Sequence, residues 1–365
     1  MPIAERVPFA DEKPARSIRK RVARILESGG LVALPTETVY GIAARADDPT
    51  AVAALRVLKG SGDEPLTWHV AEREAVDAFP HLRPLVRRLV ERYWPGPLTL
   101  VLEGVPRELA GVAAEGWTGL RLSAHRGTTG LIRDLTFPVV LSSANRHGEE
   151  PLTEPDPVFE AFGEGLELVL DSGPSRVGES SAVLRVGRGR FELLRPGLLT
   201  LQELRRTAGL ALGFCCTGNT CRSPMAAGLA RSILAERLGL APAETERMAE
   251  FGFAIASMGV SAAVGGTPAE HALAVMKEEG VDISGHRTSA AVAEEVVRLD
   301  RVYCLTEQHR ESLTRDLSPG RDKNLFLLDP AGGSIADPIG GTRDDYRRCM
   351  KRIRACIEER ATDWA

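Results

Sequence analysis

The most constraining part of this chain is an apolar run at 210–215, Leu-Ala-Leu-Gly-Phe-Cys, which leads directly into Cys-Thr-Gly-Asn-Thr-Cys-Arg-Ser-Pro at 216–224. The apolar run predicts a buried strand, and the Gly-Asn pair that follows tolerates the left-handed backbone of a tight curl. Ser223 is suited to cap a helix, and Pro224 to stand in its first turn. We therefore expect a strand, a tight loop and a helix in immediate succession, as in a parallel α/β sheet.

The loop at 216–224 has the residue types of an oxyanion site. Curled backbone can surround one tetrahedral oxyanion with N–H groups, and the N-terminus of the following helix points at the same anion. Arg222 can bind two oxygens of that anion at once, and the same positive surroundings favour the thiolate form of Cys216. A thiolate beside a phosphoryl group attacks phosphorus and forms a phosphocysteine. The other candidate anion-binding residues are Thr217, Gly218, Asn219, Thr220, Cys221 and Ser223.

The leaving group on phosphorus needs a proton, so a carboxylic acid should lie on a separate loop. Asp337 is our candidate, because Pro338 favours extended backbone and the glycines at 340–341 allow close approach. Asp329, which is also followed by proline, is the rival. We prefer Asp337 because Asp329 comes directly after an expected strand at 324–328.

These features together resemble the low-molecular-weight protein tyrosine phosphatases over about residues 210–360. The resemblance implies that Cys216 is the nucleophile, Arg222 the phosphate clamp and Asp337 the general acid, and that Asn219 helps to shape the loop. It also implies a phosphoprotein substrate and no cofactor for this domain.

The substrate of such a domain stays open between phosphotyrosine and phosphoarginine. Thr220 stands where tyrosine-directed members often have a bulkier aliphatic residue, and the loop resembles that of the bacterial protein arginine phosphatases. A small polar side chain there could admit a planar guanidinium. The chain departs from that branch at Ile339, where the branch tends to have an aromatic ring.

A further alternative is a thioredoxin-coupled arsenate reductase, whose loop is similar but which needs two more redox cysteines. Cys349 and Cys356 are seven positions apart, which on a helix is two turns, or roughly 10.5 Å, and too far for a disulfide. They fall on one apolar stripe, which favours buried core thiols. Cys221 stays open between simple packing and a reversible disulfide with Cys216.

Five ordered segments in the first 200 residues point to a second family. They are 29–41 (GGLVALPTETVYG), 93–102 (YWPGPLTLVL), 141–148 (LSSANRHG), 168–178 (LVLDSGPSRVG) and 193–200 (LLRPGLLT). Together they resemble the threonylcarbamoyl-AMP synthase family over about residues 15–200. The resemblance implies an adenylate made from threonine, bicarbonate and ATP with Mg²⁺, release of pyrophosphate, and delivery of the product to a t6A transferase complex that modifies tRNA.

The residue types in these segments suit a nucleotide and an amino acid. Lys59 can place a point charge on a phosphate, and Arg195 is a second phosphate candidate. Arg121 could hold the threonine carboxylate by a fork. The complete set of candidate ATP- and threonine-binding residues is Thr36, Lys59, His69, Arg121, Ser143, Asn145, Ser181 and Arg195.

The chain also departs from the synthase family at a phosphate-binding position. Where the family usually has Lys-x-Arg, the chain has Lys59 followed by Gly and Ser61, and Arg56 is a candidate substitute. Where the family has a Ser-Thr pair, the chain has Ser-Ala at 181–182, and where the family usually has a proline, the chain has Ser123. The first domain is therefore either an active synthase or a non-catalytic nucleotide- or amino-acid-binding module that regulates the phosphatase.

Composition and patterning set the frame for both domains. The net charge is -4 and the pI about 6.1, which argues against strong direct binding of nucleic acid. No apolar run is long enough to span a membrane, and the N-terminus has no apolar signal core, so we expect a cytoplasmic protein. All six cysteines lie beyond residue 214, which indicates reduced thiols, and none has zinc-ligand spacing, so we expect no metal site.

The pattern of strands and helices predicts an α/β protein with two domains. We expect a synthase-like domain at 1–202 with a twisted mixed sheet, a linker at 203–209, and a phosphatase domain at 210–365 with a doubly wound parallel sheet. Within the second domain, Thr267 to Glu270 has the form of a capping box that starts a helix, and Gly280 should end that helix.

Overall fold

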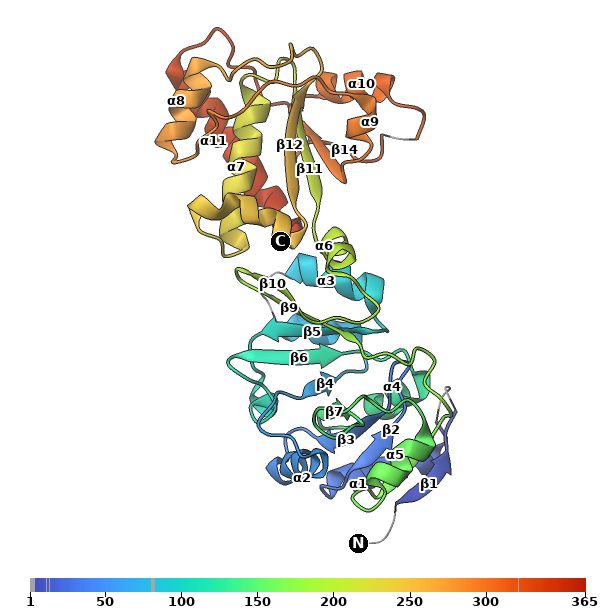
Figure 1. Ribbon diagram of the computed structural model, residues 1–365. Coiled ribbons are helices and arrows are strands. Elements are labelled where there is room, and N and C mark those ends of the chain that lie inside the picture. Colours follow the sequence, from blue (N-terminus) through green and yellow to red (C-terminus); the bar gives the residue numbers. More distant parts are fainter. Residues whose placement is uncertain (1–3, 11, 13, 80–82, 321) are drawn as a thin grey trace. The chain divides into compact units, whose positions relative to one another are not determined.

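The computed structural model describes the chain except residues 1–3, 11, 13, 80–82 and 321. It divides into two compact units, Met1–Leu204 and Arg205–Ala365, each of which has its own sheet (Figure 1). The stretch at 203–209 that we expect to be a linker lies mostly within helix α6 (Leu201–Ala208). No helix of the described residues is long and apolar enough to cross a membrane.

The first unit is built on a mixed sheet of ten strands in the order β1-β8-β2-β3-β7-β4-β6-β5-β9-β10. Its strands are β1 (Glu5–Pro8), β2 (Val32–Leu34), β3 (Gly41–Arg45), β4 (Thr67–His69), β5 (Leu98–Glu103), β6 (Trp117–Arg121), β7 (Val139–Ser143), β8 (Leu168–Asp171), β9 (Ala182–Gly187) and β10 (Arg190–Arg195). Its helices are α1 (Arg16–Glu27), α2 (Pro49–Lys59), α3 (Arg83–Tyr93), α4 (Arg126–Arg133) and α5 (Pro155–Phe162), with short 3-10 turns η1 (Arg73–Ala78) and η2 (Arg107–Leu109). The mixed sheet that we predict for this half is confirmed.

Strand β3 shows how this sheet separates two apolar layers. Ile42 and Ala44 belong to one buried cluster, and Ala43 between them belongs to the other. This follows from the alternation of side chains along a strand. Both faces of β3 are therefore buried, and polar side chains gather at the strand ends, where the candidate binding residues lie.

Residues at the two ends of helix α2 explain where it begins and ends. The Asp48 carboxylate accepts the N–H of Thr50 at 2.8 Å, and Pro49 occupies the first helical position. Gly60 ends the helix with a φ of 65°, which glycine adopts without strain. This stop places Lys59 at the last helical position.

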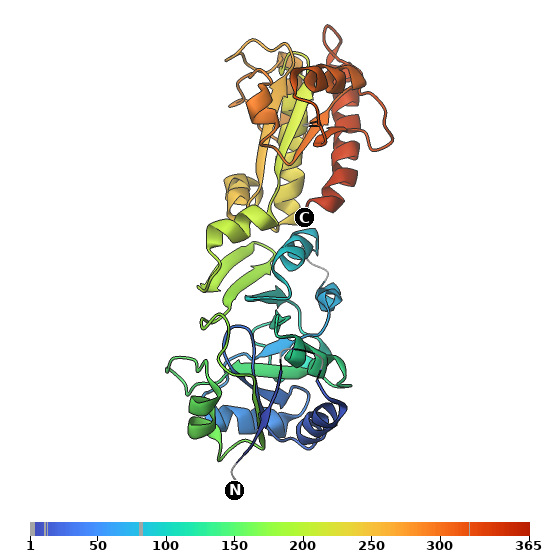
Figure 2. The same cartoon turned by 90° about the vertical axis from the view of Figure 1, so that its right-hand side faces the viewer.

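The second unit holds a four-stranded, wholly parallel sheet in the order β12-β11-β13-β14. Its strands are β11 (Ala211–Cys216), β12 (Ala254–Gly259), β13 (Arg301–Cys304) and β14 (Leu325–Leu327). Helices α7 (Arg222–Arg237), α8 (Glu270–Glu278) and α11 (Arg343–Arg360) lie on one side, and α9 (Ala293–Val296) and α10 (Glu307–Asp316) on the other (Figures 1 and 2). The remaining 3-10 turns are η3 (Pro242–Phe251) and η4 (Ala361–Asp363). The predicted doubly wound parallel sheet is confirmed.

Two helix caps differ from our expectations. Helix α8 begins at Glu270 with Ala269 as its N-cap and without a side-chain cap, so the capping box from Thr267 is wrong. The N–H of Ala269 donates to the Thr220 carbonyl at 2.9 Å, so backbone contact fixes this end. The predicted stop is present, since Gly280 has a φ of 74°.

Helix α7 starts earlier than its sequence suggests. Its N-cap is Cys221, so Ser223 is already the second helical residue and does not cap it. The Ser223 hydroxyl is used inside the loop instead, where it contacts Cys216. The need of the loop for that hydroxyl explains why our capping assignment fails.

Candidate active sites

Cys216 is the last residue of β11, and the curled loop that follows encloses its thiol. Its residue is 3% exposed, and Sγ lies 3.0 Å from the Ser223 hydroxyl. The Ser223 hydroxyl donates to the Met258 carbonyl at 3.1 Å and accepts an N–H of the Asn219 amide at 2.9 Å. The hydroxyl is thus held within reach of the thiol, and its one proton can turn from the Met258 carbonyl to a thiolate.

The side chain of Asn219 ties the loop together. Its φ is 54°, a left-handed conformation that asparagine tolerates better than most residues. Its Oδ1 accepts the N–H of Ser289 at 2.8 Å, and its Nδ2 donates to Ser257 at 3.1 Å as well as to Ser223. The residue is wholly buried. Sequence reasoning missed Ser257 and Ser289, because single serines 38 and 70 positions away carry no local signal.

The structure brings the predicted clamp and the predicted acid together. Arg222 Nη2 donates to the Asp337 carboxylate, and Nη1 donates to the Ile335 carbonyl at 3.0 Å. The Arg222 side chain is 4% exposed, whereas that of Asp337 is 36% exposed. The Nε of Arg222 is buried and has no hydrogen-bond partner among the described residues. A buried donor of this kind suits an anionic ligand.

The rival acid is engaged elsewhere. Arg352 Nη2 donates to Asp329 at 2.5 Å, and the N–H of Ala331 donates to its other oxygen at 3.0 Å. The Asp329 side chain is 8% exposed. Burial pushes the pKa of Asp329 up, but the hydrogen bonds from Arg352 and the Ala331 N–H, together with the charges of Arg352 and Arg360, hold the pKa below its usual value. A buried, ionised carboxylate with its own arginine is poorly placed to donate a proton to a leaving group.

The remaining cysteines of this unit are free and buried. Cys221 Sγ lies 3.3 Å from the Tyr346 hydroxyl and 3.5 Å from the Thr220 hydroxyl. Cys349 lies one helical turn after Tyr346, and burial raises its thiol pKa to about 12. Burial likewise raises the pKa of Cys356. Protonated thiols on the buried side of α11 favour packing over redox chemistry.

The first unit has a cavity of about 140 Å³ that gathers most of the predicted binding residues. Of the eight candidates, six line it: Thr36, His69, Arg121, Ser143, Ser181 and Arg195. Among its described lining residues none carries a carboxylate, and two are arginines. The cavity therefore suits a small anionic or zwitterionic ligand.

The other two candidates, Lys59 and Asn145, do not line this cavity but are hydrogen-bonded to Ser143, which does. Lys59 Nζ donates to the Ser142 hydroxyl at 2.7 Å and to the Ser143 carbonyl at 2.5 Å. Burial, opposed by the charge of Glu64 and assisted by that of Arg195, lowers the pKa of Lys59 to about 8. The Ser143 hydroxyl donates to Asn145 Oδ1 at 2.5 Å. These contacts join Lys59 and Asn145 to the cavity edge at Ser143.

Arg121 is oriented by a buried carboxylate that sequence reasoning missed. Its Nη2 donates to Glu37 and to Thr38, both at 2.6 Å. Glu37 also accepts the Ser123 hydroxyl at 2.5 Å, so the serine that replaces a family proline takes part in this network. Burial raises the pKa of Glu37, but the charge of Arg121 and its hydrogen bonds bring it below the usual value.

Two buried nitrogens of this cavity lack partners. Arg121 Nε and His69 Nδ1 have none among the described residues, and both residues are about 5% exposed or less. Burial lowers the pKa of His69 to about 3, and the Arg121 charge adds to this effect, so the ring is neutral at pH 7. Polar atoms left unsatisfied inside a cavity point to a polar ligand.

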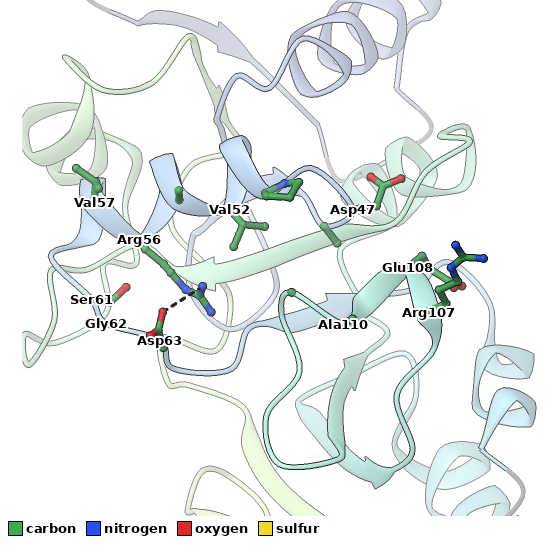
Figure 3. Close-up of a pocket in the computed structure, with 14 residues that line it drawn as sticks. Asp47, Val52, Arg56, Val57, Ser61, Gly62, Asp63, Arg107, Glu108 and Ala110 are labelled. Carbon is green, nitrogen blue, oxygen red and sulfur yellow. Dashed lines mark ion pairs between the residues drawn. The ribbon is translucent and has the colours of Figure 1, made fainter.

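Arg56 and Ser61 lie apart from the cavity that gathers most of the predicted binding residues. Arg56 turns toward Asp63 and the Glu64 carbonyl, at 3.5 Å and 3.3 Å, and lines a different cavity of about 820 Å³ (Figure 3). Ser61 lines that same cavity. The face of α2 that carries Arg56 is therefore separate from the surface where Arg121 lies.

Two family models match the chain, one within each unit. A family model described as Telomere recombination (Sua5, YciO and YrdC) matches residues 24–197. A model described as Low molecular weight phosphotyrosine protein phosphatase matches residues 211–365.

A Mycobacterium tuberculosis (strain ATCC 25618 / H37Rv) relative in the first family is 32% identical over 202 residues, which are 54% of this chain and 92% of the relative. The Protein-arginine-phosphatase of Geobacillus stearothermophilus is 32% identical over 151 residues, which are 40% of this chain and 91% of the relative. The chain belongs to both families. It is a fusion of a Sua5-type threonylcarbamoyl-AMP synthase domain and a low-molecular-weight protein phosphatase domain.

The synthase-family domain also has longer relatives. The Threonylcarbamoyl-AMP synthase of Pyrococcus abyssi (strain GE5 / Orsay) is 38% identical over 192 residues, or 51% of this chain. The matched part spans only 56% of that relative. The chain thus matches about half the length of such relatives.

Proposed function

We propose that the second unit is a cysteine-dependent protein phosphatase. The observation that carries this proposal is the Arg222 guanidinium, which is buried beside the Cys216 loop, has an unpartnered Nε and contacts Asp337. A phosphoryl group held there would face the thiolate on one side and a carboxylic acid on the other. Hydrolysis of p-nitrophenyl phosphate that is lost in Cys216→Ser is the direct test.

The proposed reaction has two steps. The Cys216 thiolate attacks phosphorus, a P–S bond forms, the bond from phosphorus to the leaving group breaks, and protonated Asp337 gives its proton to the leaving group. Water then attacks phosphorus, the P–S bond breaks, and the Asp337 carboxylate accepts the proton of the water. Arg222 holds the equatorial oxygens in both steps. Because Asp337 pairs with Arg222, an arriving phosphate competes with it for the guanidinium and releases the carboxyl for acid catalysis.

We propose phosphoarginine in proteins as the substrate. The support is the similarity to the Geobacillus arginine phosphatase together with Thr220, whose small hydroxyl side chain contacts Cys221 rather than filling the loop mouth. Phosphotyrosine is the second candidate, because Ile339 is 70% exposed and offers no flat ring for a guanidinium. Values of kcat/KM for matched phosphoarginine and phosphotyrosine peptides decide between them.

For the first unit we propose threonylcarbamoyl-AMP synthesis. The threonine amine would attack the carbon of bicarbonate and form a carbamate with loss of water, and a carbamate oxygen would then attack the α-phosphorus of ATP while the bond to pyrophosphate breaks. The support is the cavity with two arginines, a neutral histidine and two unpartnered buried nitrogens. Arg121 would hold the threonine carboxylate, and Lys59, Ser143, Asn145, Ser181 and Arg195 the nucleotide phosphates. Since no described lining residue is a carboxylate, Mg²⁺ would be carried by the triphosphate.

A non-catalytic sensor is the second candidate for this unit. Ser61 stands where the synthase family has a phosphate-binding arginine. Both Ser61 and Arg56 line a cavity other than the one that gathers most of the predicted binding residues. Pyrophosphate release with ATP, Mg²⁺, threonine and bicarbonate, each omitted in turn, separates the two. Release that needs threonine and bicarbonate supports the synthase, whereas a phosphatase rate that changes with ATP and threonine without such release supports the sensor.

The product and the boundaries complete the proposal. A threonylcarbamoyl adenylate is a reactive mixed anhydride, and we propose that a t6A transferase complex in the cytoplasm consumes it.

We further propose domains at 1–202 and 210–365 with 203–209 between them. Limited proteolysis with cleavage confined to that segment would support these limits.

A further inference from the structure

Thr217, which directly follows the nucleophile, is hydrogen-bonded to a histidine from a distant helix. His309 Nε2 lies 2.9 Å from Thr217 Oγ1, although the two residues are 92 positions apart. His309 stands near the start of α10, which lies at the same end of the parallel sheet as the loop (Figure 1). The histidine is 5% exposed, whereas Thr217 is exposed. A buried ring therefore supports a side chain at the surface of the phosphate loop.

The contacts of the second ring nitrogen, Nδ1 of His309, bear on which of the two nitrogens carries the ring proton. Thr306 is the N-cap of α10, and its hydroxyl oxygen accepts the backbone N–H of His309 at 3.4 Å. The same oxygen lies 3.0 Å from His309 Nδ1. The Thr306 oxygen can accept a second hydrogen bond or donate its own proton, and we assign the arrangement in which it donates to Nδ1. In that arrangement the ring proton lies on Nε2, and Nε2–H donates to Thr217.

The imidazole is neutral at pH 7. Burial lowers the pKa of His309 to about 4; the positive charge of Arg222 lowers it further, and the charge of Asp337 opposes them. The charged groups that act on this ring are thus the phosphate clamp and the candidate acid. A neutral ring gives one N–H to Thr217, so the Thr217 hydroxyl accepts once and keeps its proton for another acceptor.

We propose that His309 is a positioning residue of the phosphatase site, which orients Thr217 so that the threonine hydroxyl proton faces the oxygens of the phosphoryl group. This inference rests on the phosphatase function proposed above. His309 touches no substrate atom itself. It turns an exposed hydroxyl beside the nucleophile into a fixed donor, in addition to the backbone donors of the loop.

A double-mutant cycle tests the inference with p-nitrophenyl phosphate as substrate. His309→Leu and Thr217→Val should each lower kcat/KM by about three- to tenfold, the range of one neutral hydrogen bond. The double variant should be no slower than either single variant, because both remove the same contact. His309→Gln, whose amide keeps an N–H near the position of Nε2, should recover most of the activity. Gln308→Leu, at an exposed neighbour on α10, is the matched control and should be unchanged.

Two results would overturn the inference. One is a double variant whose loss equals the product of the single losses, and the other is His309→Gln behaving like His309→Leu. Nitrogen-15 NMR of the wild-type protein covers the case in which a variant fails to fold. The expected spectrum shows a neutral ring with its proton on Nε2, and a proton on Nδ1 would contradict the proposed geometry. The NMR measurement does not depend on phosphatase activity. If the proposed phosphatase function itself is wrong, the wild-type protein will not hydrolyse p-nitrophenyl phosphate, which distinguishes that failure from failure of the His309 inference.

Discussion

Arg222 and Asp337 are 115 positions apart and form an ion pair in which the arginine is nearly buried and the aspartate is half-exposed. The pair joins the first turn of α7 to the loop before α11. It sets the proposed acid beside the proposed phosphate-binding group, for which a bound phosphate would compete with the acid. The predictions below begin with this arrangement.

Cys216→Ser should reduce phosphatase turnover to background, because a serine hydroxyl in this loop is a far weaker nucleophile than a thiolate. Hydrolysis of p-nitrophenyl phosphate is the assay. Cys356→Ser, which changes a buried thiol of α11, serves as the control and should retain activity. Undiminished turnover in Cys216→Ser would remove the cysteine from the mechanism.

Asp337→Asn should slow the reaction most for substrates with poor leaving groups, since those depend on a proton from the acid. The expected loss is about 10²- to 10⁴-fold for such substrates. Rates across a series of aryl phosphates of rising leaving-group pKa provide the measurement. Asp329→Asn is the comparison, and a leaving-group effect seen only in that variant would reassign the acid.

Affinity for ATP should fall as the pH rises through about 8. Burial is the main cause that lowers the pKa of Lys59 to about 8, so the ammonium that we propose to bind the phosphates is present at pH 7 and lost above pH 8. Calorimetric titration of ATP between pH 7 and 9.5 measures this. In Lys59→Arg the positive charge persists, and the decline should disappear. An identical decline in that variant would show that another group titrates.

Ser61→Arg should tighten ATP binding if the first unit is a nucleotide site weakened by this serine. One charged hydrogen bond contributes about 1.5–3 kcal/mol, so the dissociation constant should fall by roughly tenfold or more. Gly62→Arg adds the same charge one residue further on, at a position with open space around it, and controls for general attraction. Equal gains in both variants would mean that position 61 has no special geometry.

The first unit should lose stability in acid because of His69. Its pKa is about 3 when folded, against an ordinary value of 6.5, so between these limits the unfolded chain binds the proton that the folded chain excludes. The free energy of unfolding therefore falls as the pH drops below 6.5, by up to about 1.4 kcal/mol per pH unit. Urea unfolding of wild type and His69→Asn measures it, and the variant should show a shallower slope. His147→Asn, at an exposed histidine, should leave the slope unchanged.

Local patterns predicted much of this protein. The strand, loop and helix at 210–224 follow from apolar residues, a Gly-Asn pair and Pro224, and each acts on its immediate neighbours. The same holds for α2, whose Asp48 and Gly60 fix its ends. Local rules failed for Ser223, because its hydroxyl is used inside the loop, and for the capping box at Thr267, because the Ala269 N–H holds the start of α8 to the Thr220 carbonyl.

The sequence by itself determined two α/β domains, their family features and the residue types at both sites. Only the tertiary structure decided that Asp337 rather than Asp329 meets Arg222, that Glu37 orients Arg121, and that His309 supports Thr217. The physical reason is that hydrogen bonds act over about 3 Å, while these partners are separated by dozens of residues along the chain. A folded sheet brings the ends of strands that are distant in the sequence close together, and only there does each carboxylate or imidazole acquire its partner.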